Sequence, residues 1–235
     1  MKILVFDDSA THRQSAALTL KGHDVVIVGT YDEAQGALVP KLDHAKTEKY
    51  LPDFLKEAGL PAGFNPYHDT KATPADKKKY ADAYKKATDR ATMRHNFDVV
   101  LTDLLVPASR QAQGPQGEEM VGKEMPLGAT IALLAIAVGV KKVAVVTDMN
   151  HHNHPASAAF DCFGEICKPG ANLICTNRVG SVSIDEVTGT IVDEKFLESE
   201  AGKKKYPYPE GKSWGDRKGL ADGKDWGMIL KQLFG

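Results

Sequence analysis

The sequence lacks a marked excess of charge of either sign, any long apolar run and all but a few cysteines. Its 30 Lys and Arg residues balance 31 Asp and Glu residues, which removes the global electrostatic basis for binding nucleic acid or a membrane surface. No apolar run reaches the roughly 20 residues of a membrane helix, and the start, Met1–Asp8, is too short in apolar residues for a signal peptide. Three cysteines are too few for a disulfide framework. We therefore expect a cytoplasmic globular protein with no nucleic-acid or membrane partner.

Short runs of β-branched and large apolar residues are present instead. Because these runs are apolar on two sides, they are typical of parallel strands covered by helices on each face of a sheet. Helical patterns at Ser9–Lys21 and Tyr31–Val39 alternate with them. This alternation predicts an α/β fold with a doubly wound five-stranded parallel sheet. The expected strands are Lys2–Phe6, Asp24–Val28, Asp98–Thr102, Lys142–Thr147 and Asn172–Thr176.

Two stretches exceed a minimal α/β unit, although we expect residues 1–235 to form a single domain. Residues 41–96 contain polar helical patterns at Thr47–Ala58 and Pro74–His95, which predict a helical hairpin inserted before the third strand. Its basic residues form either a solvated face or a site for an acidic partner. Residues 178–223 are rich in Gly, Lys, Pro and Tyr and predict an irregular segment, with one hairpin in Ser181–Val192. A helix within 224–235, at Trp226–Phe234, closes the chain.

A third helical pattern, Thr130–Val138, is apolar all round. Such a helix is expected to be covered on every side. The inserted hairpin, the C-terminal segment or a second copy of the chain could supply that cover. A homodimer through residues 130–138 is therefore one expectation.

Acidic residues stand directly after the predicted strands. Asp7 and Asp8 follow the first strand, Asp103 follows the third, and Thr147 and Asp148 lie at the end of the fourth. In an open parallel sheet the carboxyl ends of the strands form the ligand-binding edge, so these side chains should converge. Crowded carboxylates repel one another unless a cation neutralises them, and Mg²⁺ prefers hard oxygen ligands. The sequence therefore predicts a magnesium site; the alternative is that Asp7 or Asp8 only caps the next helix.

The same motifs resemble the receiver domain of two-component response regulators. The resemblance covers residues 1–40, 97–107 and about 128–169. It implies a flavodoxin-like sheet with strand order 2-1-3-4-5. The matching motifs, in the order of that family, are Phe6-Asp7-Asp8-Ser9, Asp103-Leu104-Leu105-Val106-Pro107 and Val145-Val146-Thr147.

The resemblance also implies a role for each matched residue. Asp103 would be the phosphoacceptor, and Thr147 would donate its hydroxyl to a phosphoryl oxygen. Asp7, Asp8, Asp103 and the backbone carbonyl of Leu105 would hold Mg²⁺, which offsets the charge of carboxylate and phosphoryl group. The partner would be a histidine kinase or a phosphotransfer protein, and the charge of the acyl phosphate would be the signal.

The lysine that this family places after its fifth strand has two competing alignments. Lys168, followed by Pro169, matches the family's pattern at this distance from Thr147. In the other alignment Asn172–Thr176 is the fifth strand, Lys168 lies in a turn and Asn177 takes the position of the lysine. Phosphoryl transfer would then be crippled or absent.

The loop after Thr147 also departs from the family. Asp148 stands where the family usually has a small residue, and a carboxylate there would repel a phosphodonor. With His151, His152 and His154 it could form a second metal site or a gate that titrates near neutral pH. The alternative is that these imidazoles only bond to backbone.

Three functions are consistent with these features. The first is an atypical stand-alone response regulator with Mg²⁺-dependent phosphoacceptance on Asp103 and output through protein contacts, because residues 178–235 show no helix-turn-helix pattern. The second is a pseudo-receiver that cannot be phosphorylated and serves as a binding or dimerisation module. The third, a metal-dependent phosphohydrolase, is disfavoured because the haloacid-dehalogenase-like family needs Asp-x-Asp where this chain has Asp7-Asp8. At most we expect self-phosphorylation without multiple turnover.

Overall fold

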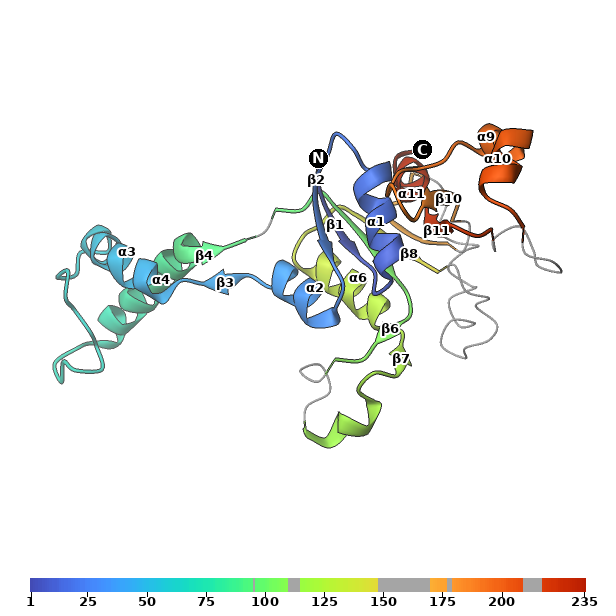
Figure 1. The fold of residues 1–235 in the computed structure, drawn as a ribbon. Helices are drawn as coiled ribbons and strands as arrows, with labels where there is room; N and C mark the ends of the chain where they lie inside the picture. Colours follow the sequence, from blue (N-terminus) through green and yellow to red (C-terminus); the bar gives the residue numbers. More distant parts are fainter. Residues whose placement is uncertain (95, 110–114, 148–169, 177–178, 209–216) are drawn as a thin grey trace. The chain divides into compact units, whose positions relative to one another are not determined.

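The computed structural model describes residues 1–94, 96–109, 115–147, 170–176, 179–208 and 217–235. The chain divides into two compact units (Figure 1). One unit comprises Met1–Leu38 and Asn96–Gly235, and the other comprises Val39–His95. The second unit nearly coincides with the residues expected to form the inserted hairpin.

A five-stranded, all-parallel sheet forms the centre of the first unit, as the sequence predicts. The order of its strands is β2-β1-β5-β8-β9. Their bounds differ from the predicted ones by at most one residue at each end, because a buried apolar run is a local signal that begins and ends sharply. The strands are β1 (Lys2–Phe6), β2 (Asp24–Val28), β5 (Val99–Asp103), β8 (Lys142–Val146) and β9 (Leu173–Thr176).

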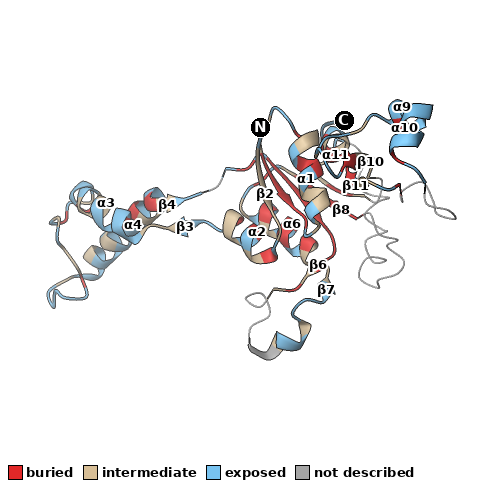
Figure 2. Ribbon diagram, viewed as in Figure 1, coloured by how far each residue is buried: buried red, intermediate tan, exposed pale blue. Residues whose placement is uncertain are grey.

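Helices cover the two faces of this sheet, and the strand residues alternate between two apolar clusters. Ile3 and Val5 of β1 belong to the cluster that includes Trp226 and Ile229. Leu4 and Phe6 belong to the other cluster. Figure 2 shows the resulting band of buried residues along the central strands. The helices are α1 (Ala10–Thr19) and α11 (Trp226–Phe234) on the first face, and α2 (Tyr31–Leu38) and α6 (Leu127–Ala137) on the second.

The apolar helix α6 is not fully covered within one copy of the chain. Ile131 and Ala135 are buried against the sheet, but Leu133 is 68% exposed and Ile136 is 45% exposed. The expectation that this helix is covered on every side is therefore wrong for a single copy. An all-apolar pattern does not reveal which face of a helix the sheet occupies.

The second unit is a helical hairpin closed by a short ladder. Strands β3 (Lys41–Leu42) and β4 (Thr92–Met93) pair antiparallel, and between them lie α3 (His44–Glu57) and α4 (Pro74–Ala91). A capping box begins α4, since Thr73 and Asp76 each accept a hydrogen bond from the other's backbone N–H. Leu55 and Leu60 pack against Ala83 in its core.

The C-terminal segment is more regular than the sequence predicts. Strand β10 (Ser181–Asp185) pairs along its whole length with β11 (Leu220–Lys224), and α9 (Glu194–Glu198) and α10 (Glu200–Lys205) lie between them in the chain. The expected hairpin within Ser181–Val192 is reduced to a bridge between Ile184 and Ile191. The N–H of Val192 still donates to the carbonyl of Ser183 at 2.8 Å, so a short hairpin is present. The sequence did not reveal the main partner of β10 because β11 lies far away in the chain.

Asp185 anchors this segment as a polar centre. Its carboxylate accepts hydrogen bonds from the Tyr206 hydroxyl, from the N–H of Thr188 at 2.9 Å and from Lys205 Nζ at 2.9 Å. These hydrogen bonds, the one from Tyr206 above all, hold the pKa of Asp185 far below its ordinary value. These hydrogen bonds tie the two ends of the segment together.

Short elements complete the first unit. The two-residue strands β6 (Val106–Pro107) and β7 (Glu124–Met125) pair antiparallel, and a 3₁₀ helix spans Pro115–Met120. Among the residues described, no helix combines the length and apolar character needed to cross a membrane.

Candidate functional site

Two buried carboxylates lie side by side at the carboxyl edge of the sheet. Asp7 follows β1, Asp103 is the last residue of β5, and the pairing of Phe6 with Thr102 brings the two aspartates next to each other. Asp7 is 0% exposed and Asp103 is 6% exposed. Asp8, by contrast, is exposed. The predicted convergence of Asp7 and Asp103 is therefore present in the structure.

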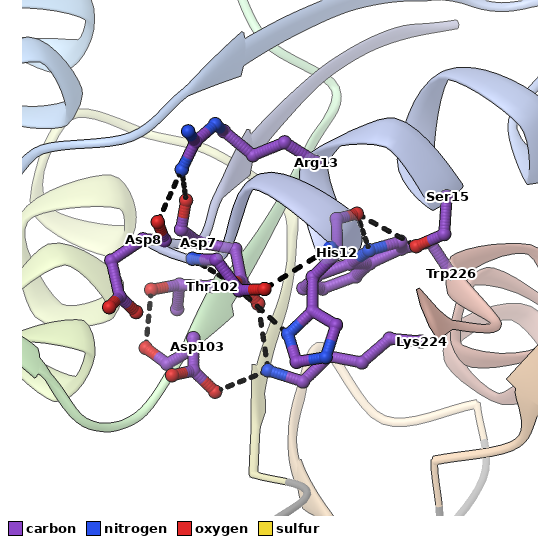
Figure 3. A network of polar contacts seen from close by, with 10 residues as sticks. Asp7, Asp8, His12, Arg13, Ser15, Thr102, Asp103, Lys224 and Trp226 are labelled. Carbon is purple, nitrogen blue, oxygen red and sulfur yellow. Dashed lines mark hydrogen bonds and ion pairs between the residues drawn. The ribbon is translucent and has the colours of Figure 1, made fainter. Parts of the chain in front are cut away.

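A lysine that the sequence did not single out lies between these two carboxylates. Lys224 Nζ stands 2.7 Å from Asp7 Oδ2 and 2.7 Å from Asp103 Oδ1 (Figure 3). Its side chain is 2% exposed. Such charge-assisted hydrogen bonds are short and strong. The ammonium group thus compensates much of the negative charge buried at this edge.

His12 completes the surroundings of Asp7. The backbone N–H of Ser9 donates to Asp7 Oδ1 at 2.9 Å, and His12 Nδ1 lies 3.3 Å from the same oxygen. Burial alone would raise the pKa of Asp7, but the hydrogen bonds from His12 and Lys224 and the charge of Lys224 outweigh it. The pKa of Asp7 is therefore held below its ordinary value, and Asp7 is ionised at neutral pH.

The pKa of Asp8 is shifted in the opposite direction. Desolvation, followed by the charge of Asp7, raises the pKa of Asp8. Arg13 does not pair with either carboxylate; its Nη1 donates to the backbone carbonyls of Asp7 at 2.9 Å and of Asp8 at 2.6 Å. Arg13 therefore holds the loop after β1, and Asp8 remains a carboxylate directed away from Lys224 (Figure 3).

The C-terminal segment carries Lys224 to the site by packing on α1. A Cβ atom on Gly223 would lie 2.5 Å from the Cβ of Ser15, so only glycine allows this approach. Trp226, fully buried, donates its indole N–H to the carbonyl of His12 at 2.9 Å. Asp225 caps α11 by accepting from the N–H of Met228. The contacts of Gly223 and Trp226 with α1 thus place Lys224 beside His12 and Asp7.

The N-terminus of α6 approaches the site from the other face. A Cβ atom on Gly128 would lie 1.6 Å from the carbonyl oxygen of Asp103, and the Gly128 N–H donates to the carbonyl of Leu104 at 3.1 Å. Leu105, whose carbonyl was an expected metal ligand, is 5% exposed. Thr147 follows β8, is 7% exposed, and donates its N–H to the Thr176 carbonyl at 3.2 Å.

The contacts at this edge do not match a preformed metal site. Three aspartates offer hard oxygen donors, which suit Mg²⁺ chemically. However, Asp7 and Asp103 share the ammonium of Lys224, and no group of three or more acidic, histidine or cysteine side chains in the described part of the chain is arranged to hold a metal ion. The ammonium group of Lys224 therefore occupies the position between the two carboxylates.

Several expected site residues lie outside the described residues. They include the two candidates for the family's lysine and the residues of the histidine loop. The fifth strand of the sheet is β9 (Leu173–Thr176), as in the second alignment, but the positions of Lys168 and Asn177 themselves are not described. Lys224 supplies an ammonium group to the site from elsewhere. It was missed because Leu220–Lys224 contains a single large apolar residue and shows no strand pattern. The expected residues that are not described are Asp148, His151, His152, His154, Lys168 and Asn177.

A cavity of about 660 Å³ lies elsewhere, lined by residues that include Phe97, Val140, Leu173 and Phe234. Phe97, Val140 and Leu173 stand just before or at the start of strands β5, β8 and β9. The cavity therefore lies at the edge of the sheet opposite to Asp7 and Asp103. It is not part of the acidic site.

Comparisons of this chain with models of protein families, with curated proteins and with solved structures found no match. The contacts among Asp7, Asp103, His12 and Lys224 are thus the basis for assigning a function.

Proposed function

We propose that this chain is an atypical, stand-alone receiver-like protein that accepts a phosphoryl group on Asp103. The observation that carries the proposal is the position of Lys224, whose ammonium contacts the two buried carboxylates at the carboxyl edge of the sheet. A cation beside a carboxylate nucleophile lowers the repulsion between that nucleophile and an incoming phosphoryl group.

The topology of the sheet supports this proposal. When its five strands are counted in chain order, the observed order β2-β1-β5-β8-β9 reads 2-1-3-4-5. That is the order of flavodoxin-like sheets, whose ligands bind at the carboxyl edge beside the first and third strands. Asp7 and Asp103 stand at the ends of those two strands.

The proposed step is an in-line phosphoryl transfer. A carboxylate oxygen of Asp103 attacks the phosphorus of an acyl phosphate or a phosphohistidine, and a new oxygen–phosphorus bond forms. The bond from phosphorus to the donor breaks, and its electron pair leaves with the donor. Lys224 Nζ pairs with a phosphoryl oxygen. Thr147 follows Val146, which pairs with Asp103 in the sheet, and its hydroxyl donates to a second phosphoryl oxygen. The product is an aspartyl phosphate.

The test is the intact mass of the protein after incubation with acetyl phosphate, with and without Mg²⁺ and after rapid quenching. We expect one added phosphoryl group on the wild type and none on Asp103→Asn. Lys224→Met should form far less adduct, whereas Lys204→Met, which changes an exposed lysine of the same segment, should behave as wild type. Absence of an adduct from the wild type under every condition would refute phosphoacceptance.

A second candidate is a binding module that is never phosphorylated. It is favoured by the limited access to Asp103, whose side chain is 9% exposed beneath Lys224. Leu133 and Ile136, exposed on α6, would then contact a second copy of the chain. In sedimentation, Leu133→Asp should abolish self-association and Asp103→Asn should leave it unchanged. A protein that stays monomeric at high concentration would exclude this dimer.

A further inference from the structure

We propose that the ammonium group of Lys224 is the resident cation of the acidic site and that it excludes a divalent metal ion from Asp7 and Asp103. The inference rests on the contacts of the unphosphorylated protein and does not depend on the proposed phosphoacceptance. It differs from the sequence-based expectation of a magnesium site.

The first support is steric and electrostatic. Lys224 Nζ stands 2.7 Å from one oxygen of each carboxylate. A bound Mg²⁺ needs oxygen ligands at about 2.1 Å, so an ion bridging the same two oxygens would overlap the ammonium nitrogen. The other oxygen of Asp7 accepts from the Ser9 N–H at 2.9 Å and lies 3.3 Å from His12 Nδ1. An ion at Asp7 would therefore have to displace existing donors.

The second support is that Lys224 is held in place by its own segment. Lys224 pairs with Ser181 in the β10–β11 ladder. The N–H of Asp225 donates to the carbonyl of Gly180 at 2.6 Å, and Trp226 is fully buried. A surface lysine could swing aside at little cost, but these contacts fix the backbone on each side of Lys224. A metal ion at this position would have to push the buried Lys224 side chain, 2% exposed, out of its contacts with both carboxylates.

The third support is the charge that would remain without this lysine. Asp7 and Asp103 would then share a buried site next to Asp8 with no ammonium between them. Three hard-oxygen donors with uncompensated charge are what a divalent cation requires. Removal of the ammonium should therefore let a divalent cation bind between Asp7 and Asp103, with the charge of Asp8 nearby.

The test is Mn²⁺ binding to the full-length chain, followed by the loss of the electron paramagnetic resonance signal of free Mn²⁺. We expect no specific site in the wild type or in Lys204→Met. Lys224→Met should gain one site, with affinity roughly tenfold or more above any residual wild-type binding. Adding Asp103→Asn to Lys224→Met should abolish it. The thermal melting of the wild type should be the same in EDTA and in Mn²⁺.

Two results would overturn the inference. One is a wild-type Mn²⁺ site that Asp7→Asn or Asp103→Asn removes, since ion and ammonium would then coexist. The other is a folded Lys224→Met protein without any metal site. If Lys224→Met does not fold, Lys224→Gln provides the same comparison. If Lys224→Gln does not fold either, Mn²⁺ binding to the wild type decides the inference. The phosphorylation assay is separate, so failure of one proposal does not imply failure of the other.

Discussion

At the scale of single residues, adjacent Asp7 and Asp8 have opposite environments. Asp7 is buried, receives hydrogen bonds from His12 and Lys224, and has a lowered pKa. Asp8 lacks these donors, and desolvation and the charge of Asp7 raise its pKa. Ionised Asp7 therefore stabilises the fold above its ordinary pKa of 3.8, and this contribution is lost as the pH falls through the lower, folded-state pKa. Ionised Asp8 destabilises the fold at neutral pH.

Replacement of Asp8 should accordingly stabilise the protein. Asp8→Asn removes a carboxylate whose charged form is disfavoured in the folded state, so we expect a higher melting temperature at pH 7 than for wild type. The gain should shrink to nothing below pH 3.8, where Asp8 is protonated in the folded and unfolded states. Thermal unfolding across this pH range measures the effect, with Asp82→Asn on α4 as the exposed control. A lower melting temperature for Asp8→Asn than for wild type at pH 7 would contradict the upward shift of the Asp8 pKa.

Loss of Lys224 should be costly to the fold. Lys224→Met leaves Asp7 and Asp103 buried without their shared ammonium, and removing one partner of a buried ion pair typically costs about 3–5 kcal/mol. The free energy of unfolding in urea measures the loss. Exposed Lys204→Met should change it by no more than about 0.5 kcal/mol. Equal stability of the two variants would show that the Lys224 contacts contribute little.

At the scale of elements, the important contact is the one between β11 and α1. Gly223 allows it because a Cβ atom would collide with Ser15 at 2.5 Å. The next residue in the strand is Lys224, and Trp226 bonds to the carbonyl of His12 on the same helix. The position of the ammonium therefore depends on how closely two elements pack that are about 200 residues apart in the chain.

A methyl group at this contact should disturb the packing and the site together. Gly223→Ala is expected to cost about 1–3 kcal/mol through overpacking and to weaken the exclusion of Mn²⁺ by moving Lys224. Gly36→Ala in α2 is the matched control, because a Cβ there meets no atom within 4 Å. It should stabilise by about 0.5–1 kcal/mol, since alanine suits a helix interior better. Denaturant unfolding compares the two; a neutral Gly223→Ala would mean that β11 shifts freely.

At the scale of the whole molecule, the chain forms two compact units, and the acidic site belongs entirely to the one that contains the sheet. The Val39–His95 unit enters and leaves through the paired residues of β3 and β4, so its chain ends lie next to each other. It has its own apolar core around Leu55 and Leu60. Insertions with this geometry are usually tolerated and removable.

The helical unit should be dispensable for the site. Replacing residues 43–91 with a short Gly-Ser linker should leave the unfolding transition of the sheet unit in place and its response to acetyl phosphate and to Mn²⁺ unchanged. Circular dichroism, intact mass and metal binding measure these properties. Loss of the adduct in a variant that still folds would show that residues 43–91 contribute to the site.

The sequence alone determined the sheet and the acids on its edge. Five buried runs predict five strands because each strand is a local pattern of apolar residues, and Asp7 and Asp103 follow from the rule that parallel strands share a carboxyl edge. The N-cap of α4 at Thr73 is equally local, whereas the cap of α1 is Ser9 and not Asp7 or Asp8.

Contacts between residues far apart in the chain determine which cation pairs with these carboxylates. Lys224 reaches them because β11 pairs with distant β10 and packs on α1 through Gly223, and neither contact leaves a periodic signal in Leu220–Lys224. The tertiary structure also decided that α6 exposes Leu133, since an apolar helix carries no mark of its buried face. Local patterns thus specified the scaffold and its carboxylates, whereas long-range packing supplied their counter-charge.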